Sequence, residues 1–246
     1  MRIASWEFAP GLWPTLATLL VLPLFISLGV WQLDRAEQKR VLHHEFESRQ
    51  DADAIDLNSK QALRGIFDEL HWRKVLAEGA FSRDINILLD NQIENGVAGY
   101  FVYTPFKFKE QDVWVLVNRG WITIGDSRDN PPRISTAQEA FNITGSVKSP
   151  PWTGILLAEN IVEQLDEATY RVQKLELAGI EELLNLEFLP YVIRMGPESP
   201  GGFTRQWKVP GSGEERNLGY AFQWFAMAAA IFVIYLVLNI KPRNRS

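Results

Sequence analysis

Hydrophobic residues gather in two long runs near the ends of the chain. From Phe8 to Leu33, and again from Asn217 to Ile240, no residue carries a charge. About 20 helical residues cross a bilayer core of about 30 Å, so each run is long enough to span a membrane. A core helix of a soluble protein rarely stays uncharged on every face over such a length. The pattern therefore predicts two transmembrane helices, at residues 13–33 and 218–240.

Between these runs the apolar stretches are short and alternate with polar positions. Residues 34–49 mix charges with good helix formers, which predicts that the first helix continues beyond its apolar part. The alternating stretches predict strands at residues 72–81, 85–90, 99–106, 113–121, 141–149, 154–158, 169–175 and 190–195. Only three residues separate the first two of these strands, a spacing typical of a hairpin. One helix is expected over Leu177–Leu186 because its apolar side chains share a face.

Many short strands with few helices predict a β-rich α+β domain built on an antiparallel sheet, and a barrel-like closure of that sheet is one of the forms it can take. The Pro/Gly-rich residues 196–202 and 209–217 are predicted loops. The fold class is thus a membrane protein, with two terminal transmembrane helices flanking an extramembrane domain. The predicted organisation is a short N-terminus, helix, external domain, helix and tail, at residues 1–12, 13–33, 34–217, 218–240 and 241–246.

Charge sets the expected orientation. The tail carries Lys241, Arg243 and Arg245 without an acid, and Arg2 lies near the other end. By the positive-inside rule both termini are predicted to be cytoplasmic and residues 34–217 translocated. The first apolar run exceeds a signal peptide's core of about 7–15 residues, and no A-x-A site follows it. These features predict an uncleaved anchor and a multi-pass protein of the bacterial inner membrane with a periplasmic domain.

Composition excludes several kinds of chemistry. The chain has no cysteine and three methionines, which excludes disulfides, zinc-cysteine sites and iron–sulfur clusters and disfavours a copper(I) site. The net charge of the chain is −5, and the excess of acidic residues lies in residues 34–217, between the two apolar runs. An acidic domain is not expected to bind nucleic acid. His43, His44 and Glu47 can approach one another on a helix, but a solvated helix face is the favoured interpretation and no metal site is predicted.

Sequence motifs for catalysis are missing as well. No G-x-S-x-G elbow, phosphate-binding P-loop or H-E-x-x-H helix occurs. Carboxylate pairs for acid–base chemistry can come from distant positions, which leaves an enzyme as one alternative. From its motifs we therefore predict no catalytic residue and expect that the protein is not an enzyme.

Three short motifs do carry a resemblance. The first helix ends in LGVWQLDR (residues 28–35), followed by Lys39; the central strands contain GY, TP and VLVNRGW (residues 99–100, 104–105 and 115–121); the second helix opens with GYAFQWFA (residues 219–226). In this order and topology the motifs resemble the Surf1/Shy1 family of cytochrome c oxidase assembly proteins. The resemblance covers almost the whole chain.

That resemblance implies an assembly factor for a haem-copper terminal oxidase, which assists haem a insertion or stabilises the nascent catalytic subunit. Implied partners are this subunit, proteins of haem a synthesis or insertion, and membrane lipid; haem a would be held transiently. Arginine can grip propionates bidentately, and tryptophan can stack on a porphyrin or pack at an interface or in a core. The candidate cofactor-binding residues are Trp31, Arg35, Arg119, Trp121, Tyr220, Gln223 and Trp224.

One departure from the family pattern concerns the haem iron. Asn217 stands where the family commonly has a histidine. A neutral imidazole is a good axial ligand and an asparagine is not. Tyr220, or His43 or His44 from the other helix, are alternative ligands, and weak or absent haem binding is another outcome. The alternative functions are a membrane-anchored haem-binding carrier and an envelope enzyme of unknown substrate.

Overall fold

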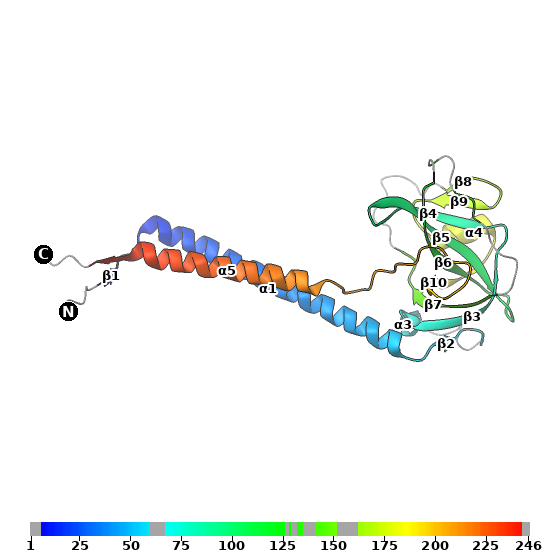
Figure 1. Cartoon of the computed structure of the whole chain (residues 1–246), viewed down its shortest axis with the longest axis horizontal. Coiled ribbons are helices and arrows are strands. Elements are labelled where there is room, and N and C mark those ends of the chain that lie inside the picture. The colour runs from blue at the N-terminus through cyan, green and yellow to red at the C-terminus, as the bar shows by residue number, and fades with distance from the viewer. Residues whose placement is uncertain are drawn as a thin grey trace. The chain divides into compact units, whose positions relative to one another are not determined.

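The computed structural model describes residues 6–59, 67–125, 128, 132–134, 141–151 and 162–242. The chain forms two compact units (Figure 1). One unit joins residues 1–46 to residues 208–246 and is a pair of helices, and the other, residues 47–207, is rich in strands. Each is described by itself.

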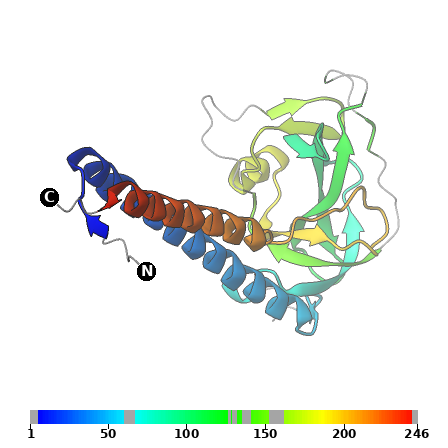
Figure 2. The ribbon, with the colours of Figure 1, turned by 60° about the vertical axis from the view of Figure 1, so that its left-hand side comes forward.

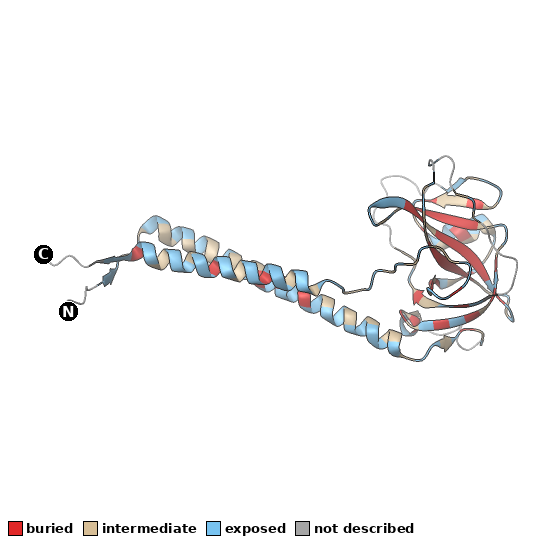
Figure 3. Ribbon diagram, in the orientation of Figure 1, coloured by how far each residue is buried: buried red, intermediate tan, exposed pale blue. Residues whose placement is uncertain are grey.

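The helix pair consists of α1 (Leu12–Asp51) and α5 (Glu214–Asn239), which lie side by side in Figures 1 and 2. The expected continuation of the first helix beyond its apolar run is confirmed, since α1 extends to Asp51. Helix α5 starts one turn before the predicted span. By length and composition both helices are able to cross a membrane, and most of their side chains are exposed (Figure 3).

Small residues bring the two helices together. Gly29 of α1 is buried against the ring of Phe225, so close that a Cβ atom there would lie 2.7 Å from the ring carbons. On α5, Ala221 and Ala228 are buried. Small side chains let apolar helices approach closely, which is how helices pack when no water is available to drive them together.

Two short strands pair at one end of the helix pair. Strand β1 (Trp6–Phe8) pairs antiparallel with β11 (Ile240–Pro242). Beside them the buried Asn239 side chain accepts a hydrogen bond from the Gly11 backbone N–H at 2.7 Å and donates one to the Tyr235 carbonyl at 2.7 Å. The amide thus satisfies backbone groups at the start of α1 and the end of α5 together.

The second unit is built on a closed sheet of five strands. In order of pairing these are β3 (Lys74–Phe81), β7 (Phe141–Lys148), β10 (Phe188–Met195), β6 (Trp114–Thr123) and β5 (Val97–Phe108). The sheet closes because the last residues of β5 pair back onto β3, with Phe106 opposite Phe81. The expected β-rich, barrel-like domain between two terminal helices is therefore confirmed.

Further elements continue the sheet beyond the closed barrel. The first residues of β5 pair with β4, which continues the sheet through β9 and β8, while β2 pairs with β3 and two short helices complete the unit. Their bounds are β4 (Asn86–Glu94), β9 (Thr169–Val172), β8 (Val162–Gln164), β2 (Ile55–Asp56), α3 (Phe67–Leu70) and α4 (Leu177–Leu184). The predicted helix from Leu177 is confirmed.

Alternate residues of the barrel strands pack in different hydrophobic clusters. The barrel interior holds side chains such as Phe106, Val117 and Ile193, whereas Leu116 and Val192, one position along, pack in a second cluster with Ile180 of α4. The period of two thus places neighbouring residues on opposite faces of the sheet, and both faces are partly covered. Figure 3 shows the strands as the most buried part of this unit.

The pairing of the strands differs from the pairing predicted from the sequence in two respects. Strands β3 and β4 do not form a hairpin, because the long strand β5 pairs with β4 through its first half and with β3 through its end. Most pairs are antiparallel, but β10–β6, β4–β9 and β2–β3 are parallel. The predicted strand at residues 154–158 lies outside the described residues.

Candidate functional site

A cavity of about 510 Å³ opens between α1 and α5, where the two helices leave their apolar stretches. The described residues of its walls all belong to these two helices. The lining residues are Trp31, Gln32, Arg35, Gln38, Lys39, Leu42, Arg216, Asn217 and Tyr220. The cavity therefore joins two sequence motifs that lie almost at opposite ends of the chain.

Helical spacing explains the contribution of α1. Trp31, Arg35, Gln38 and Leu42 follow one another at intervals of three or four residues, so they lie along one face. The Arg35 guanidinium donates a hydrogen bond to the Gln38 side chain at 3.0 Å. Because the helix continues into its charged segment, this face changes from an aromatic ring to cationic and amide groups within three turns.

The first turns of α5 complete the site. The Asn217 side-chain amide donates a hydrogen bond of 2.7 Å to the side-chain oxygen of the buried Gln32. Tyr220 follows one turn later and is about half exposed. Lys39 reaches across from α1, where its ammonium donates to the Gly213 carbonyl at 3.1 Å.

Every charged residue among the described lining residues is a cation. Arg35, Lys39 and Arg216 line it, and no aspartate or glutamate is among the lining residues. The rings of Trp31 and Tyr220 supply flat apolar surface beside these cations. Such a site can bind a carboxylate or phosphate attached to an apolar body, since guanidinium groups bind these anions bidentately.

The fit to haem a differs between the two parts of that molecule. Its acidic propionates match the three cations, and its flat macrocycle matches the aromatic walls. Among the described lining residues there is no histidine, cysteine or methionine for the iron, whereas the Tyr220 phenol is of an axial-ligand type. His43 does not line the cavity; its ring lies 3.3 Å from the Pro210 carbonyl oxygen. The cavity thus fits the acidic edge of a haem better than its metal centre.

Two predicted residues of α5 lie outside this cavity. Gln223 is exposed, and it is not part of the lining. The ring of Trp224 packs on Phe25 of α1, with the ring centroids 5.4 Å apart. Trp224 therefore contributes to helix packing, one of the two roles expected for these tryptophans.

Arg119 lies inside the β-rich unit. It is an additional residue in β6, because Tyr103 of β5 pairs with Asn118 and Val102 with Gly120. Gly120 has φ +121°, a conformation that favours glycine, and it permits this bulge. The bulge turns the Arg119 side chain into the interior, where it is 2% exposed.

Interior groups engage the Arg119 guanidinium. It lies 5.0 Å from the ring centroid of Phe81 and 4.9 Å from that of Phe203, and its Nε donates to the Gly201 carbonyl at 2.8 Å. Burial lowers the pKa of Arg119 to about 10. These contacts fit a structural arginine that holds the 196–205 segment against the sheet.

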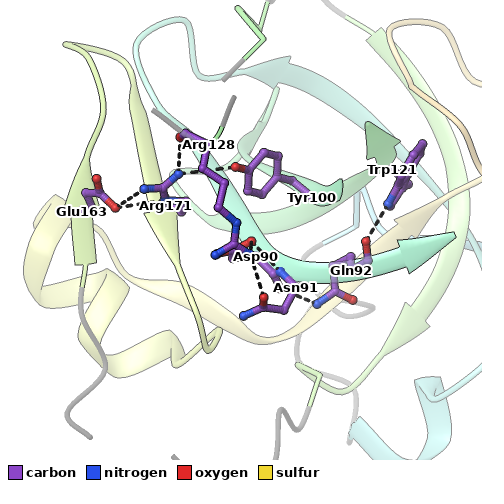
Figure 4. Close-up of polar contacts among 8 residues, drawn as sticks. All are labelled: Asp90, Asn91, Gln92, Tyr100, Trp121, Arg128, Glu163 and Arg171. Carbon is purple, nitrogen blue, oxygen red and sulfur yellow. Dashed lines mark hydrogen bonds and ion pairs between the residues drawn. The ribbon is translucent and has the colours of Figure 1, made fainter. Parts of the chain in front are cut away.

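Trp121 and a neighbouring ion-pair network belong to the same unit (Figure 4). The Trp121 indole N–H donates to the Gln92 carbonyl at 3.1 Å, which fixes the ring against β4. Asp90 is buried and its carboxylate contacts Arg128 at 3.2 Å. In the described part of this network the charged neighbour of Asp90 is an arginine and not a second carboxylate, so the network does not supply the carboxylate pair considered above.

Comparison with known proteins fits this arrangement. The model of the SURF1 family matches residues 19–229. The chain belongs to the SURF1 family. A SURF1-like protein of Rickettsia bellii is 26% identical over 94% of this chain and 92% of its own length, and one of Rickettsia felis is 29% identical over 90% and 95%. The cytochrome oxidase assembly protein SHY1 of Saccharomyces cerevisiae is 29% identical over 52% of this chain and 34% of its own length.

For the SURF1-family chain, the structure brings Trp31, Arg35, Asn217 and Tyr220 to one cavity and leaves Arg119, Trp121, Gln223 and Trp224 elsewhere. The residues that line the cavity but were not predicted as site residues from the sequence include Gln32, Gln38, Leu42 and Arg216. Three of these follow from the helical spacing around Trp31 and Arg35. The pairing of Gln32 with Asn217 needs knowledge of which helix faces meet.

Proposed function

We propose that this protein assists the assembly of a haem-copper terminal oxidase by binding its nascent catalytic subunit and holding haem a transiently in the cavity between α1 and α5. Membership in the SURF1 family and the name of the yeast relative support the assembly role. The observation that carries the haem part is the cavity itself, with its three cations and two aromatic rings.

In this proposal haem a is cargo. Arg35 and Arg216 bind its propionates, Lys39 adds positive charge, and the rings of Trp31 and Tyr220 cover the macrocycle. No imidazole is among the described lining residues, so in this proposal the cavity holds haem a through its propionates and macrocycle and not through a histidine–iron bond. No covalent step by this chain is required.

The helix pair is the proposed membrane anchor. The exposed apolar side chains of α1 and α5 suit lipid or the helices of an oxidase subunit. Pairing of β1 with β11 keeps both chain ends on one side, and the basic residues of the tail favour the cytoplasm for that side. The β-rich unit is then periplasmic in a bacterial inner membrane, and the cavity lies near the periplasmic boundary.

A complementation experiment tests this function. A strain that lacks the gene and any paralogue receives the parent chain, the double variant Arg35→Gln/Arg216→Gln, or the control Arg40→Gln. Arg40 is an exposed cation of the same helix that pairs with Glu37 and does not line the cavity. Haem a content and oxidase activity of the membranes are measured per amount of the protein.

We expect the parent and Arg40→Gln to restore both quantities and the double variant to restore neither fully. Normal haem a and oxidase activity in the deletion strain would overturn the assembly role. Full restoration by the double variant would overturn the cavity as the haem site and leave the assembly role to the helix faces.

The second candidate is a haem-binding carrier in its own right, in which haem binding is the function and not one step of oxidase assembly. The same cavity favours it. The purified full chain in lipid nanodiscs is titrated with haem a, and the Soret band is recorded. A saturable shift that weakens in Arg35→Gln/Arg216→Gln supports it, and the absence of any shift at micromolar haem overturns it.

A further inference from the structure

A second cationic cavity lies on the outer face of the barrel, within residues 47–207. Its volume is about 240 Å³, and strands β3, β7 and β10 form its floor. Its lining includes Lys74, Leu76, Ser146, Arg194, Pro197 and Trp207. None of them belongs to the helix-pair cavity.

Strand register places the two cations of this cavity, Lys74 and Arg194, on either side of β7, and Lys148 lies next to the cavity lining. Ser146 of β7 lies opposite Lys74 of β3 on one side and opposite Arg194 of β10 on the other. Lys148, two residues further along β7, shares the face of Ser146. Three cations from three adjacent strands are therefore neighbours on the same face of the sheet.

Aromatic rings hold two of these cations in place. The Arg194 guanidinium lies 4.8 Å from the ring centroid of Trp207, whose indole N–H donates to the Met195 carbonyl at 2.9 Å. The Lys148 ammonium lies 5.0 Å from the ring centroid of Trp72. The positions of both charged groups are thus fixed before any ligand arrives, which lowers the entropic cost of binding.

No carboxylate compensates these charges within the part of the chain that the structure describes. The ion pairs found there do not include Lys74, Lys148 or Arg194. Burial lowers the pKa of Arg194 and, together with the charge of Arg194, lowers the pKa of Lys148 to about 8. Like charges held close and partly buried are costly, and an anion between them removes that cost.

The rest of the lining describes the ligand. The half-exposed side chain of Leu76, the ring of Pro197 and the indole of Trp207 form an apolar wall, while Thr144 and Ser146 offer hydroxyl groups. We propose that this cavity binds a carboxylate attached to a small apolar body, with Arg194 as the principal partner of the carboxylate. Ligand cavities for larger molecules usually span about 300–1,000 Å³, so this one suits a single side chain or a small organic acid and not a haem.

Two sources can present this chemistry. A free organic acid supplies the carboxylate directly, and a partner polypeptide supplies it as a glutamate or aspartate beside an apolar residue. The inference does not rest on the proposed function, because the cavity is in the other unit of the chain and takes a different ligand.

Ligand titration of the full chain in nanodiscs tests the site. The probes are 3-phenylpropionate and its uncharged isostere 3-phenylpropanamide, followed by the blocked peptide acetyl-Gly-Phe-Glu-Gly-amide and its glutamine counterpart. Saturation-transfer NMR and isothermal titration measure affinity. We expect each acid to bind at least about 10-fold more tightly than its amide, since a charge-assisted hydrogen bond contributes more than a neutral one. The tighter acid, free or peptide, identifies the source.

Two variants and a matched control locate the binding. Arg194→Met retains the packing under Trp207 and should weaken acid binding by about 10-fold or more. Lys148→Met should weaken it less. Arg83→Met removes an exposed cation of the same unit, with the same change of net charge, and should leave the affinity within about 2-fold.

A third variant keeps the proposal falsifiable if Arg194→Met does not fold. Ser146→Asp places a carboxylate between Lys74 and Arg194, so it should raise the melting temperature and abolish acid binding. Asn142→Asp is its control, because it adds the same charge to the same face of β7 opposite Glu78. Equal affinity for acid and amide, unchanged acid binding in Arg194→Met, or a lowered melting temperature of Ser146→Asp would overturn the proposal.

Discussion

The side-chain amide of Asn217 donates a hydrogen bond of 2.7 Å to the side-chain oxygen of Gln32, which joins the start of α5 to the middle of α1. The two residues are 185 positions apart in the chain. In an apolar helix pair such a bond fixes both the rotation and the register of the helices, because a polar group without its partner is costly there.

We expect Gln32→Leu and Asn217→Leu each to destabilise the helix pair by about 0.5–2 kcal/mol, since each leaves one amide without its partner. The double variant should be less destabilised than the sum of the two. Unfolding of the full chain in nanodiscs, followed by tryptophan fluorescence, measures the three values. Additive single effects would show that the bond contributes nothing of its own.

Asn217→His supplies the ring nitrogen that the cavity lining lacks. If the proposed haem site is right, this variant should bind haem a about 10-fold more tightly than the parent, with a Soret band typical of imidazole ligation. Asn217→Gln is the control, as it offers no imidazole. A parent-like Soret spectrum in Asn217→His would show that position 217 does not face the iron.

Gly29→Leu should separate the helices, because even a Cβ atom at this position would lie 2.7 Å from the Phe225 ring. Overpacking of this kind costs about 1–3 kcal/mol or more. Gly219→Leu is a matched control, since nothing lies within 4 Å of its Cβ position.

Cross-linking between two introduced cysteines measures whether the helices separate. No other cysteine can react, because the chain has none of its own. Cysteines placed at Thr15 and Tyr235, whose hydroxyls lie 3.0 Å apart, are joined with a short bismaleimide reagent that spans the length lost with the tyrosine ring, and the yield reports whether the helices remain together. The cross-link should form in the Gly219→Leu background and fall sharply in the Gly29→Leu background. Equal yields in both would contradict the close contact at Gly29.

Arg119→Ala should lower the free energy of unfolding by about 2–4 kcal/mol, because it leaves the Gly201 carbonyl short of a donor and opens a gap between Phe81 and Phe203. Urea denaturation checks the value against Arg83→Ala, an exposed arginine. Haem a binding per folded molecule should stay unchanged. Loss of haem binding at parental stability would instead assign Arg119 to the haem site.

Stability at alkaline pH should depend on Lys148. Its pKa is lowered to about 8 in the folded chain from an ordinary value of 10.5. Between these pH values the unfolded chain holds a proton that the folded chain has lost, so the free energy of unfolding rises with pH through this interval. Burial is the larger cause of this lowered pKa, and the nearby charge of Arg194 lowers it further. The ammonium also lies 5.0 Å from the ring centroid of Trp72.

Lys148→Met and Lys148→Arg should both lack this rise, since neither side chain titrates there. Urea unfolding of the three proteins at pH 7, 8, 9 and 10 gives the comparison. Parallel pH dependence in all three would contradict the lowered pKa.

Local pattern was sufficient for much of the fold. Helix α1, including its polar extension to Asp51, follows from apolar length and helix-forming residues, and most strands follow from their period of two. The prediction failed where pairing was inferred from proximity in the chain. Strand β4 does not return along β3, because β5 is long enough to pair with both.

The residues of the candidate site were likewise predictable from the sequence only in part. Trp31 and Arg35 share a helix face by spacing alone, and Tyr220 lies one turn from Asn217, so these neighbours were within reach of sequence reasoning. Arg119 was not, because its inward direction depends on a bulge whose partner residues are on β5. Arg194 gave no sequence signal at all, since its cationic neighbours lie on two other strands.

The sequence by itself determined two apolar helices around a β-rich middle and the residues that mark the ends of those helices. These properties depend on contacts a few residues apart, which composition and period record directly. Only the tertiary structure decided the closure of β5 onto β3, the bond between Asn217 and Gln32, and the two cationic cavities. Each of these depends on contacts between distant segments, which are set by the packing of whole faces against one another.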